Sequence, residues 1–198
     1  MSTSAVSLRT RGTVLADVIP GARARDAALV LGGALLTALF AQIAINVPPS
    51  PVPITGQTLA VVLAGGALGA RRGAASQALY LVLGLFLPVY SEGGSGFDVL
   101  WGATGGYIIG FIVAAFIVGA LAERGADRRP LLAFLAFAGG QLSIFAIGVP
   151  WLKVATDMSW GDAIHNGFTI FIVGGIVKAL IGGVTLPSAW HLVRRLER

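Results

Sequence analysis

The chain has 198 residues, of which 56% are hydrophobic and only 12% are charged, and its mean hydropathy is +0.83. A soluble core cannot bury so many apolar side chains, so the sequence indicates an integral protein of the lipid bilayer. The absence of cysteine excludes disulfides and thiolate metal sites, and the net charge of +5 comes from short arginine clusters between apolar runs, which is typical of membrane topology rather than nucleic-acid binding.

The first apolar run follows a basic amino-terminal segment. Residues 1–26 contain four arginines and no continuous apolar run, so we expect a cytoplasmic tail and no signal peptide. Residues 27–47 are uncharged and long enough to cross the hydrocarbon core as a helix. On this helix Ala34 and Ala38 form a strip of small side chains, which permits close packing by another helix but also occurs on lipid-facing surfaces.

A proline-rich segment follows the first helix. Pro48, Pro49, Pro51 and Pro53 exclude a regular helix, so we expect a stiff, extended loop. Its apolar character places it against the protein, either as a simple connector or as a lid over a pocket.

The next two apolar runs are residues 54–70 and 73–90, separated by Arg71 and Arg72. Both are short but fall within the range of spanning helices. Gln77 and Tyr80 lie three residues apart on the third helix and therefore share a face. They either join helices by hydrogen bonds or contact a ligand.

Three further helices are expected at residues 101–122, 131–152 and 167–189, followed by a cytoplasmic tail at 191–198. The fourth contains glycines at positions 102, 106 and 110, a spacing that permits close helix packing. Tyr107 lies beside them, and its hydroxyl can serve either the structure or a ligand. The chain is therefore predicted to be all-α, with one membrane domain of six helices over residues 27–190.

Lys178 is the only charged residue in the 23-residue stretch 167–189. An ammonium at such a depth costs roughly 3 kcal/mol or more, so intramembrane cations usually face a polar interior and mark a functional site. A lysine near a helix end can extend to the membrane surface, but Lys178 is central. We therefore expect Lys178 to contact a ligand, with an anion as the natural candidate.

The distribution of basic residues predicts the orientation. Twelve of the fourteen lie in the two termini and in the loops after the second and fourth helices. By the positive-inside rule both termini are cytoplasmic, and the loops after the first, third and fifth helices lie outside.

The chain contains no Walker A motif, nucleophile elbow or HExxH motif, and no selectivity filter is evident. No clear inverted repeat is visible either. We therefore expect a solute-binding membrane subunit that is not an enzyme and takes its energy from a partner. A stand-alone facilitator and a small membrane enzyme remain as alternatives.

Several segments resemble one known family: residues 41–45, 51–59 (PVPITGQTL), 68–74 (LGARRGA), 80–84, 87–90 and 102–107 (GATGGY). They are similar to the BioY family, the biotin-binding substrate subunits of energy-coupling factor (ECF) transporters. The resemblance implies a six-helix bundle that holds one biotin near the external face, with the proline loop as its lid.

The resemblance also implies the partners and the site. The partners would be a transmembrane coupling subunit, docked on Ala34 and Ala38, and two ABC ATPases in a bacterial or archaeal cytoplasmic membrane. No cofactor or metal is implied, since biotin is the transported ligand. The expected substrate-binding residues are Thr55, Gln57, Gln77, Tyr80, Tyr107, Gly175 and Lys178.

The sequence departs from the family pattern before Lys178. Gly175 stands where the family usually has an aspartate, and Ile170 stands at a usual proline. We expect the ureido N–H groups of biotin to meet a backbone carbonyl, Gln77, Asp157 or Asp162, and Lys178 to donate to the ureido oxygen. The altered position leaves a different vitamin as an alternative ligand.

Overall fold

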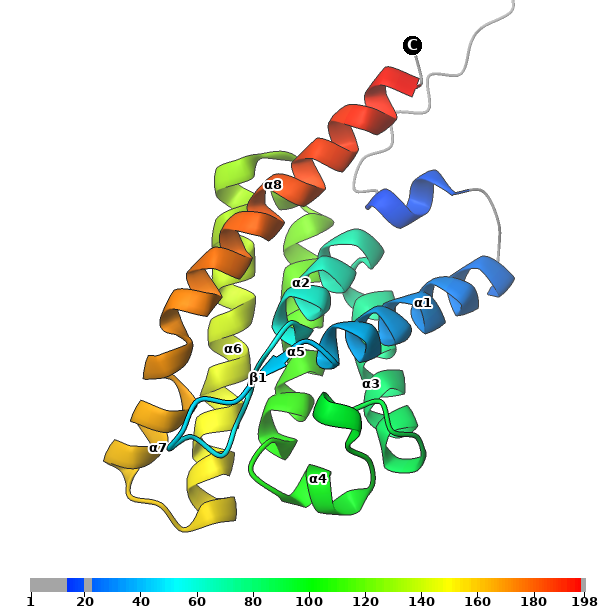
Figure 1. The fold of residues 1–198 in the computed structure, drawn as a ribbon. Coiled ribbons are helices and arrows are strands. Elements are labelled where there is room, and N and C mark those ends of the chain that lie inside the picture. Colours follow the sequence, from blue (N-terminus) through cyan, green and yellow to red (C-terminus); the bar gives the residue numbers. More distant parts are fainter. Residues whose placement is uncertain (1–13, 20–22, 197–198) are drawn as a thin grey trace, which may run out of the picture.

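The computed structural model describes residues 14–19 and 23–196 and is almost entirely helical (Figure 1). Residues 1–13 and 20–22 of the predicted amino-terminal tail, and residues 197–198, lie outside the described residues. The elements, in chain order, are the 3₁₀ turn η1 (Leu15–Val18), α1 (Arg23–Ala41), β1 (Ala44–Ile45), β2 (Ile54–Thr55), α2 (Gln57–Leu68), α3 (Ala70–Phe86), η2 (Ser91–Gly93), α4 (Phe97–Trp101), α5 (Gly105–Ala122), η3 (Ala126–Arg128), α6 (Pro130–Thr156), α7 (Trp160–Gly167), η4 (Thr169–Phe171) and α8 (Ile172–Leu196).

The described part of the chain forms a helical membrane protein. Five helical segments are long and apolar enough to cross a membrane, and the shorter apolar helix α2 is the sixth. Helix α5 is the most buried of the five long helical segments and packs against α2, α3 and α6, while α6 also packs against α8. In Figure 1, α6 and α8 run along one flank of the bundle and α1 crosses the other side obliquely.

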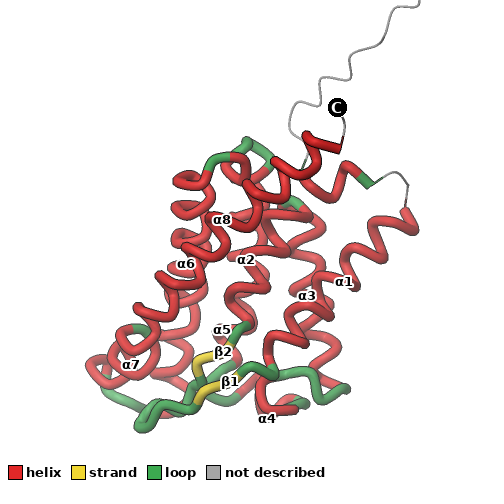
Figure 2. Tube along the Cα trace, turned by 45° about the horizontal axis from the view of Figure 1, so that its top comes forward, coloured by secondary structure: helices red, strands yellow, loops and turns green. Residues whose placement is uncertain are grey.

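Helix α1 ends at Ala41, six residues before the predicted end. The chain then forms a short antiparallel hairpin in which Ala44 pairs with Thr55 and Ile45 pairs with Ile54 (Figure 2). This pairing brings together the two ends of the proline-rich loop, which spans residues 46–53. Because the prolines cannot continue a helix, the backbone groups on either side find partners in the hairpin instead.

The predicted docking strip is buried inside this chain. Ala34 is 0% exposed and Ala38 is 9% exposed, and this face of α1 packs against α2 and α3. The prediction that these two alanines offer a surface to a coupling subunit is therefore wrong for this structure. Their small side chains do permit close helix packing, but the neighbouring helices belong to the same chain.

A single glycine separates α2 from α3, where a loop containing Arg71 and Arg72 was predicted. Gly69 has φ +86, a left-handed conformation that favours glycine and reverses the chain sharply. Both arginines therefore lie in the first turn of α3. Arg72 forms ion pairs with Asp17 at 2.6 Å and Asp26 at 3.1 Å, which fix η1 and α1 to this end of the bundle.

The predicted fourth helix, residues 101–122, corresponds to α5, which begins at Gly105. Residues 102–104 form a turn that joins it to the short helix α4, which ends at Trp101. The expected close packing of its glycines is present at the interface of α5 with α6. A Cβ atom at Gly106 would lie 2.2 Å from Trp151, and one at Gly110 would lie 3.0 Å from the Ile144 backbone. These two glycines let the two helix backbones come together.

The last two long helices are displaced relative to the predicted runs. Helix α6 continues to Thr156, and the expected external loop contains α7, whose first turn is capped by Ser159. Helix α8 begins at Ile172 and continues to Leu196, so residues 191–196 extend this helix instead of forming a separate tail. No proline or glycine follows Pro187 to end it earlier.

Candidate functional site

A cavity of about 220 Å³ lies beneath the proline-rich loop. Its walls come from that loop and from β2, α2, α4, α5, α6, η4 and α8, together with the segments on either side of α4. The lining residues are Pro51, Val52, Pro53, Thr55, Gln57, Thr58, Tyr90, Ser91, Glu92, Val99, Thr104, Tyr107, Ile108, Phe111, Gln141, Phe145, Phe171, Gly175 and Lys178. Aromatic and aliphatic walls with a few polar groups are typical of small-molecule sites.

Lys178 faces this cavity, as predicted for a central intramembrane cation. Its Nζ donates to the backbone oxygen of Thr55 at 2.6 Å and to the Thr58 hydroxyl at 2.9 Å. Within residues 14–19 and 23–196, no carboxylate forms an ion pair with it. An ammonium has three N–H donors, so these two bonds leave one for a ligand.

Thr55 and Gln57 also line the cavity and connect it to a buried tyrosine. The Thr55 hydroxyl donates to Gln57 Oε1 at 2.8 Å, and Gln57 Nε2 donates to the Tyr80 hydroxyl at 2.6 Å. Tyr80 in turn donates to the Val89 backbone oxygen at 3.2 Å. Tyr80 is fully buried and does not line the cavity, so it holds Gln57 in place and is not placed to contact a ligand.

Gln77 lies away from the cavity. Its Oε1 accepts from the Thr37 hydroxyl at 3.2 Å, and its Nε2 donates to the Ser76 hydroxyl at 3.0 Å. The interhelical hydrogen bond between α1 and α3 is therefore the correct one of the two predicted roles. The prediction of Gln77 as a ligand contact is wrong for this structure.

Tyr107 and Gly175 both line the cavity. The Tyr107 hydroxyl donates to the Gly167 backbone oxygen at 2.9 Å, so it fixes the end of α7 while the ring forms part of the wall. Gly175 accepts a bond from Gln141 Nε2 at 3.0 Å through its backbone oxygen. Both residues thus line the cavity, and their contact with a ligand stays a prediction.

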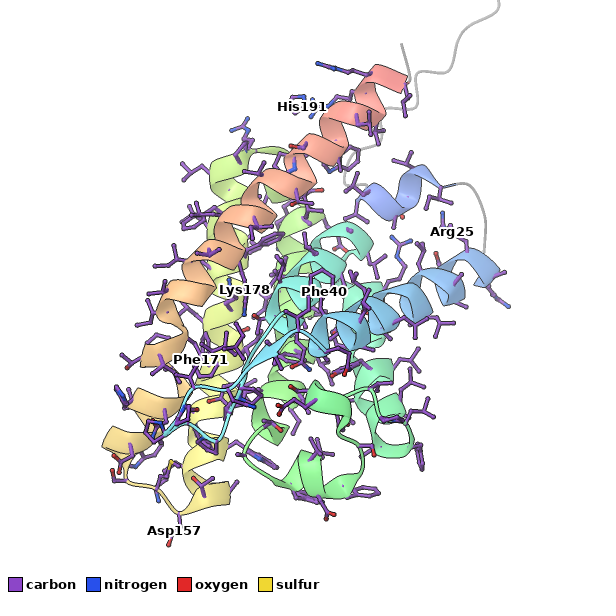
Figure 3. All side chains as sticks on the ribbon, in the orientation of Figure 1. Arg25, Phe40, Asp157, Phe171, Lys178 and His191 are labelled. Atoms are coloured by element: carbon purple, nitrogen blue, oxygen red, sulfur yellow. The ribbon has the colours of Figure 1, made fainter. Side chains whose placement is uncertain are left out.

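Two predicted carboxylate acceptors lie outside the cavity. Asp157 and Asp162 are exposed at the α6–α7 end of the molecule, and neither lines the cavity. Figure 3 shows Asp157 at the bottom of the view, whereas Phe171 and Lys178 lie higher up. Asp162 instead accepts from the Ser159 hydroxyl at 2.7 Å, which belongs to the cap of α7.

Part of the proline-rich loop lines the cavity, and its role as a lid stays a prediction. Pro51 and Pro53 line the cavity, whereas Pro48 and Pro49 do not. Two hydrogen bonds tie the loop to other elements. The Ser50 hydroxyl donates to the Asn166 backbone oxygen of α7 at 2.8 Å. Asn46 Nδ2 donates to Glu92 at 2.7 Å.

Sequence reasoning missed part of the lining. The side chains of Gln141 and Thr58 are polar groups in apolar helices, and this rarity is a signal that could have indicated them. Val99, Phe111 and Phe145 offered no such signal, since apolar side chains in a membrane protein face lipid and interior alike.

Charged residues gather at the opposite end of the bundle. The ion pairs of Arg72 lie there, and Glu123 Oε1 accepts from the Ala70 backbone N–H at 2.9 Å at the α2–α3 turn. Nearby, Trp190 of α8 donates to the Asp127 carboxylate. In Figure 1 the α2–α3 turn, the α5–α6 connection and the carboxyl end of α8 all lie at the top, away from the loop that covers the cavity.

Comparisons with known proteins identify similar chains. The BioY family model matches residues 9–195. A Lactococcus lactis subsp. cremoris protein named biotin transporter BioY2 is 38% identical over 157 residues, covering 77% of this chain and 83% of that protein. A Rhizobium etli protein named biotin transporter BioY is 35% identical over 166 residues, covering 76% and 88%. A crystal structure of the S-component for biotin from an ECF-type ABC transporter matches with a TM-score of 0.74 at 24% identity. The matched region covers 85% of this chain and 94% of the chain in that structure. The two proteins therefore share a fold.

Proposed function

This chain belongs to the BioY family, and from that premise we propose that it captures biotin as the substrate-binding subunit of an ECF-type transporter. It is a multi-pass membrane protein and not an enzyme. The observation that carries the proposal is the covered cavity, whose wall holds the ammonium of Lys178.

The chemistry of the cavity suits biotin. Biotin has a cyclic urea, a thioether ring and a valeryl chain that ends in a carboxylate. The remaining N–H of Lys178 donates to the urea oxygen, and the rings of Tyr107, Phe111 and Phe171 cover the apolar parts of the bicycle. The carboxylate extends toward the external loops. Burial of the apolar ring surface supplies affinity, and the few polar groups fix the orientation.

The proposal includes partners, because the chain contains no Walker A motif. A transmembrane coupling subunit and two ABC ATPases would supply the energy, in a bacterial or archaeal cytoplasmic membrane. The positive-inside rule places the end with Arg72 and Arg124 in the cytoplasm. The cavity and the proline-rich loop then lie toward the outside, which is the side where a solute is captured.

Retention of labelled biotin by the purified protein tests the proposal. We expect the wild type to bind biotin, and Lys178→Ala to weaken binding at least a hundredfold, because an unpaired urea oxygen and a lost charged donor cost about 3 kcal/mol. Lys153→Ala is the matched control, since it removes the only other lysine and lies outside the cavity.

Two results would contradict the proposal. A wild-type protein that retains no biotin would exclude biotin as the ligand. Equal retention by Lys178→Ala and Lys153→Ala would exclude the proposed role of Lys178. Size-exclusion profiles of both variants show whether either has lost its fold.

A further inference from the structure

Gln141 carries a buried acceptor that the protein itself leaves unused. The residue is only 4% exposed and lines the cavity from α6. Its Oε1 has no hydrogen-bond partner anywhere in the described part of the chain. Buried polar atoms in folded proteins are nearly always paired, so an unpaired one in a cavity wall indicates a group that a ligand or water completes.

The orientation of this amide is fixed by α8. Gln141 Nε2 donates to the Gly175 backbone oxygen at 3.0 Å, which assigns the nitrogen to the helix and leaves Oε1 as the free acceptor. Gly175 makes this close approach possible, because a Cβ atom there would lie 3.3 Å from Oε1. The acceptor therefore occupies the space beside residue 175 that a larger side chain would fill.

This acceptor lies on the same wall as the ammonium. Gly175 and Lys178 are three residues apart on α8, so they share one face of the helix, and both line the cavity. The wall thus offers an acceptor, held at Gly175, about one helical turn from a donor. A ligand that matches this wall has an N–H next to a carbonyl oxygen, as a cyclic urea does.

We infer that Gln141 Oε1 accepts an N–H of the ligand's urea ring while Lys178 donates to the urea oxygen. This inference rests on the proposed function and adds the residue that distinguishes a urea from other rings of the same shape. A site built to hydrogen-bond a polar group rejects analogues that lack the group, because its own buried atom then stays unpaired.

The test compares biotin with its two ureido N-methyl derivatives, each of which lacks one N–H. Dissociation constants are measured for wild type, for Gln141→Leu and, as the matched control, for Ser143→Ala. Ser143 lies on the same helix outside the cavity, and among the described residues its hydroxyl bonds only to the Gly140 backbone oxygen.

We expect Gln141→Leu to weaken biotin binding about ten- to hundredfold, the usual effect of one lost hydrogen bond in a buried site. Ser143→Ala, which leaves the cavity wall unchanged, should bind biotin as wild type does. One N-methyl isomer should bind wild type much more weakly than biotin does, and this discrimination should shrink in Gln141→Leu.

The inference is overturned if Gln141→Leu binds biotin as wild type does. It is also overturned if wild type and Gln141→Leu discriminate equally against both methylated isomers, since Oε1 would then meet water or serve packing. A wild-type protein that does not bind biotin would overturn the proposed function and this contact with it. Wild-type binding combined with an unaffected Gln141→Leu would overturn the contact alone.

Discussion

Asp127 is a buried carboxyl at the charged end of the bundle, only 2% exposed, and it accepts a hydrogen bond from Trp190. Burial raises the pKa of this carboxyl, while the Trp190 bond and the charge of Arg128 act in the opposite direction. A raised folded-state pKa means that the group stabilises the fold most at low pH. That contribution is lost as the pH rises through the raised folded pKa.

The residue-scale prediction follows from this bond. Trp190→Phe keeps an aromatic ring but removes the donor, so we expect it to cost about 1–3 kcal/mol of stability at neutral pH. The thermal unfolding midpoint in detergent should fall, whereas Trp160→Phe, at a side chain 55% exposed, should leave it unchanged.

Asp127→Asn is the companion variant, because it removes the titrating group. It should flatten the part of the pH dependence of the midpoint that lies above the ordinary carboxyl pKa. Equal midpoints for the two tryptophan variants would show that the bond to Asp127 contributes nothing measurable.

The sequence predicts the surroundings best for polar or charged residues that stand in apolar helices. Lys178 could be assigned to the interior because a lone ammonium in an apolar helix needs polar partners. Its actual partners, Thr55 and Thr58, are more than a hundred positions away in the chain and could not be derived from local pattern. Gln77 and Gln141 are both amides in apolar helices, and only the packing shows that one joins helices and the other lines the cavity.

At the scale of elements, the proline-rich loop is tied to the segment after α3 by the bond between Asn46 and Glu92. Both residues are exposed, so the bond is worth about 1 kcal/mol, and its loss should raise the biotin dissociation rate several-fold. Asn46→Ala tests this by chase of labelled biotin, with Asp98→Asn as an exposed control outside the cavity. An unchanged rate in Asn46→Ala would show that the bond does not restrain the loop.

The number of apolar helices could be predicted, but the orientation of α1 could not. Hydropathy indicates where the chain can cross a bilayer, since the cost of polar groups there is large. It does not show which side of an apolar helix faces protein, because lipid and protein interior are equally apolar. Ala34 and Ala38 were therefore assigned to a partner surface although they pack within the chain.

For the whole molecule, the cavity and the charged end lie at opposite ends of the bundle. This separation predicts that the chain binds the solute while partner proteins at the charged end supply the energy for uptake. Cells with this chain alone should bind external biotin without accumulating it, because in the proposed function the energy for uptake comes from the partner ATPases. Accumulation should appear when a coupling subunit and its ATPases are co-expressed and should disappear when the ATPases carry inactivating changes. Concentrative uptake by the chain alone would contradict the proposed partnership.

The bond from Lys178 to the Thr55 backbone has a further consequence for how the site empties. Thr55 belongs to strand β2, at the end of the covering loop, so any withdrawal of that strand deprives a cation of an acceptor inside the bilayer. Movement of β2 away from Lys178 therefore carries an electrostatic penalty, unless a ligand carbonyl or a water accepts the hydrogen bond instead. The Lys178 ammonium thus couples the binding and release of solute to the movement of the proline-rich loop.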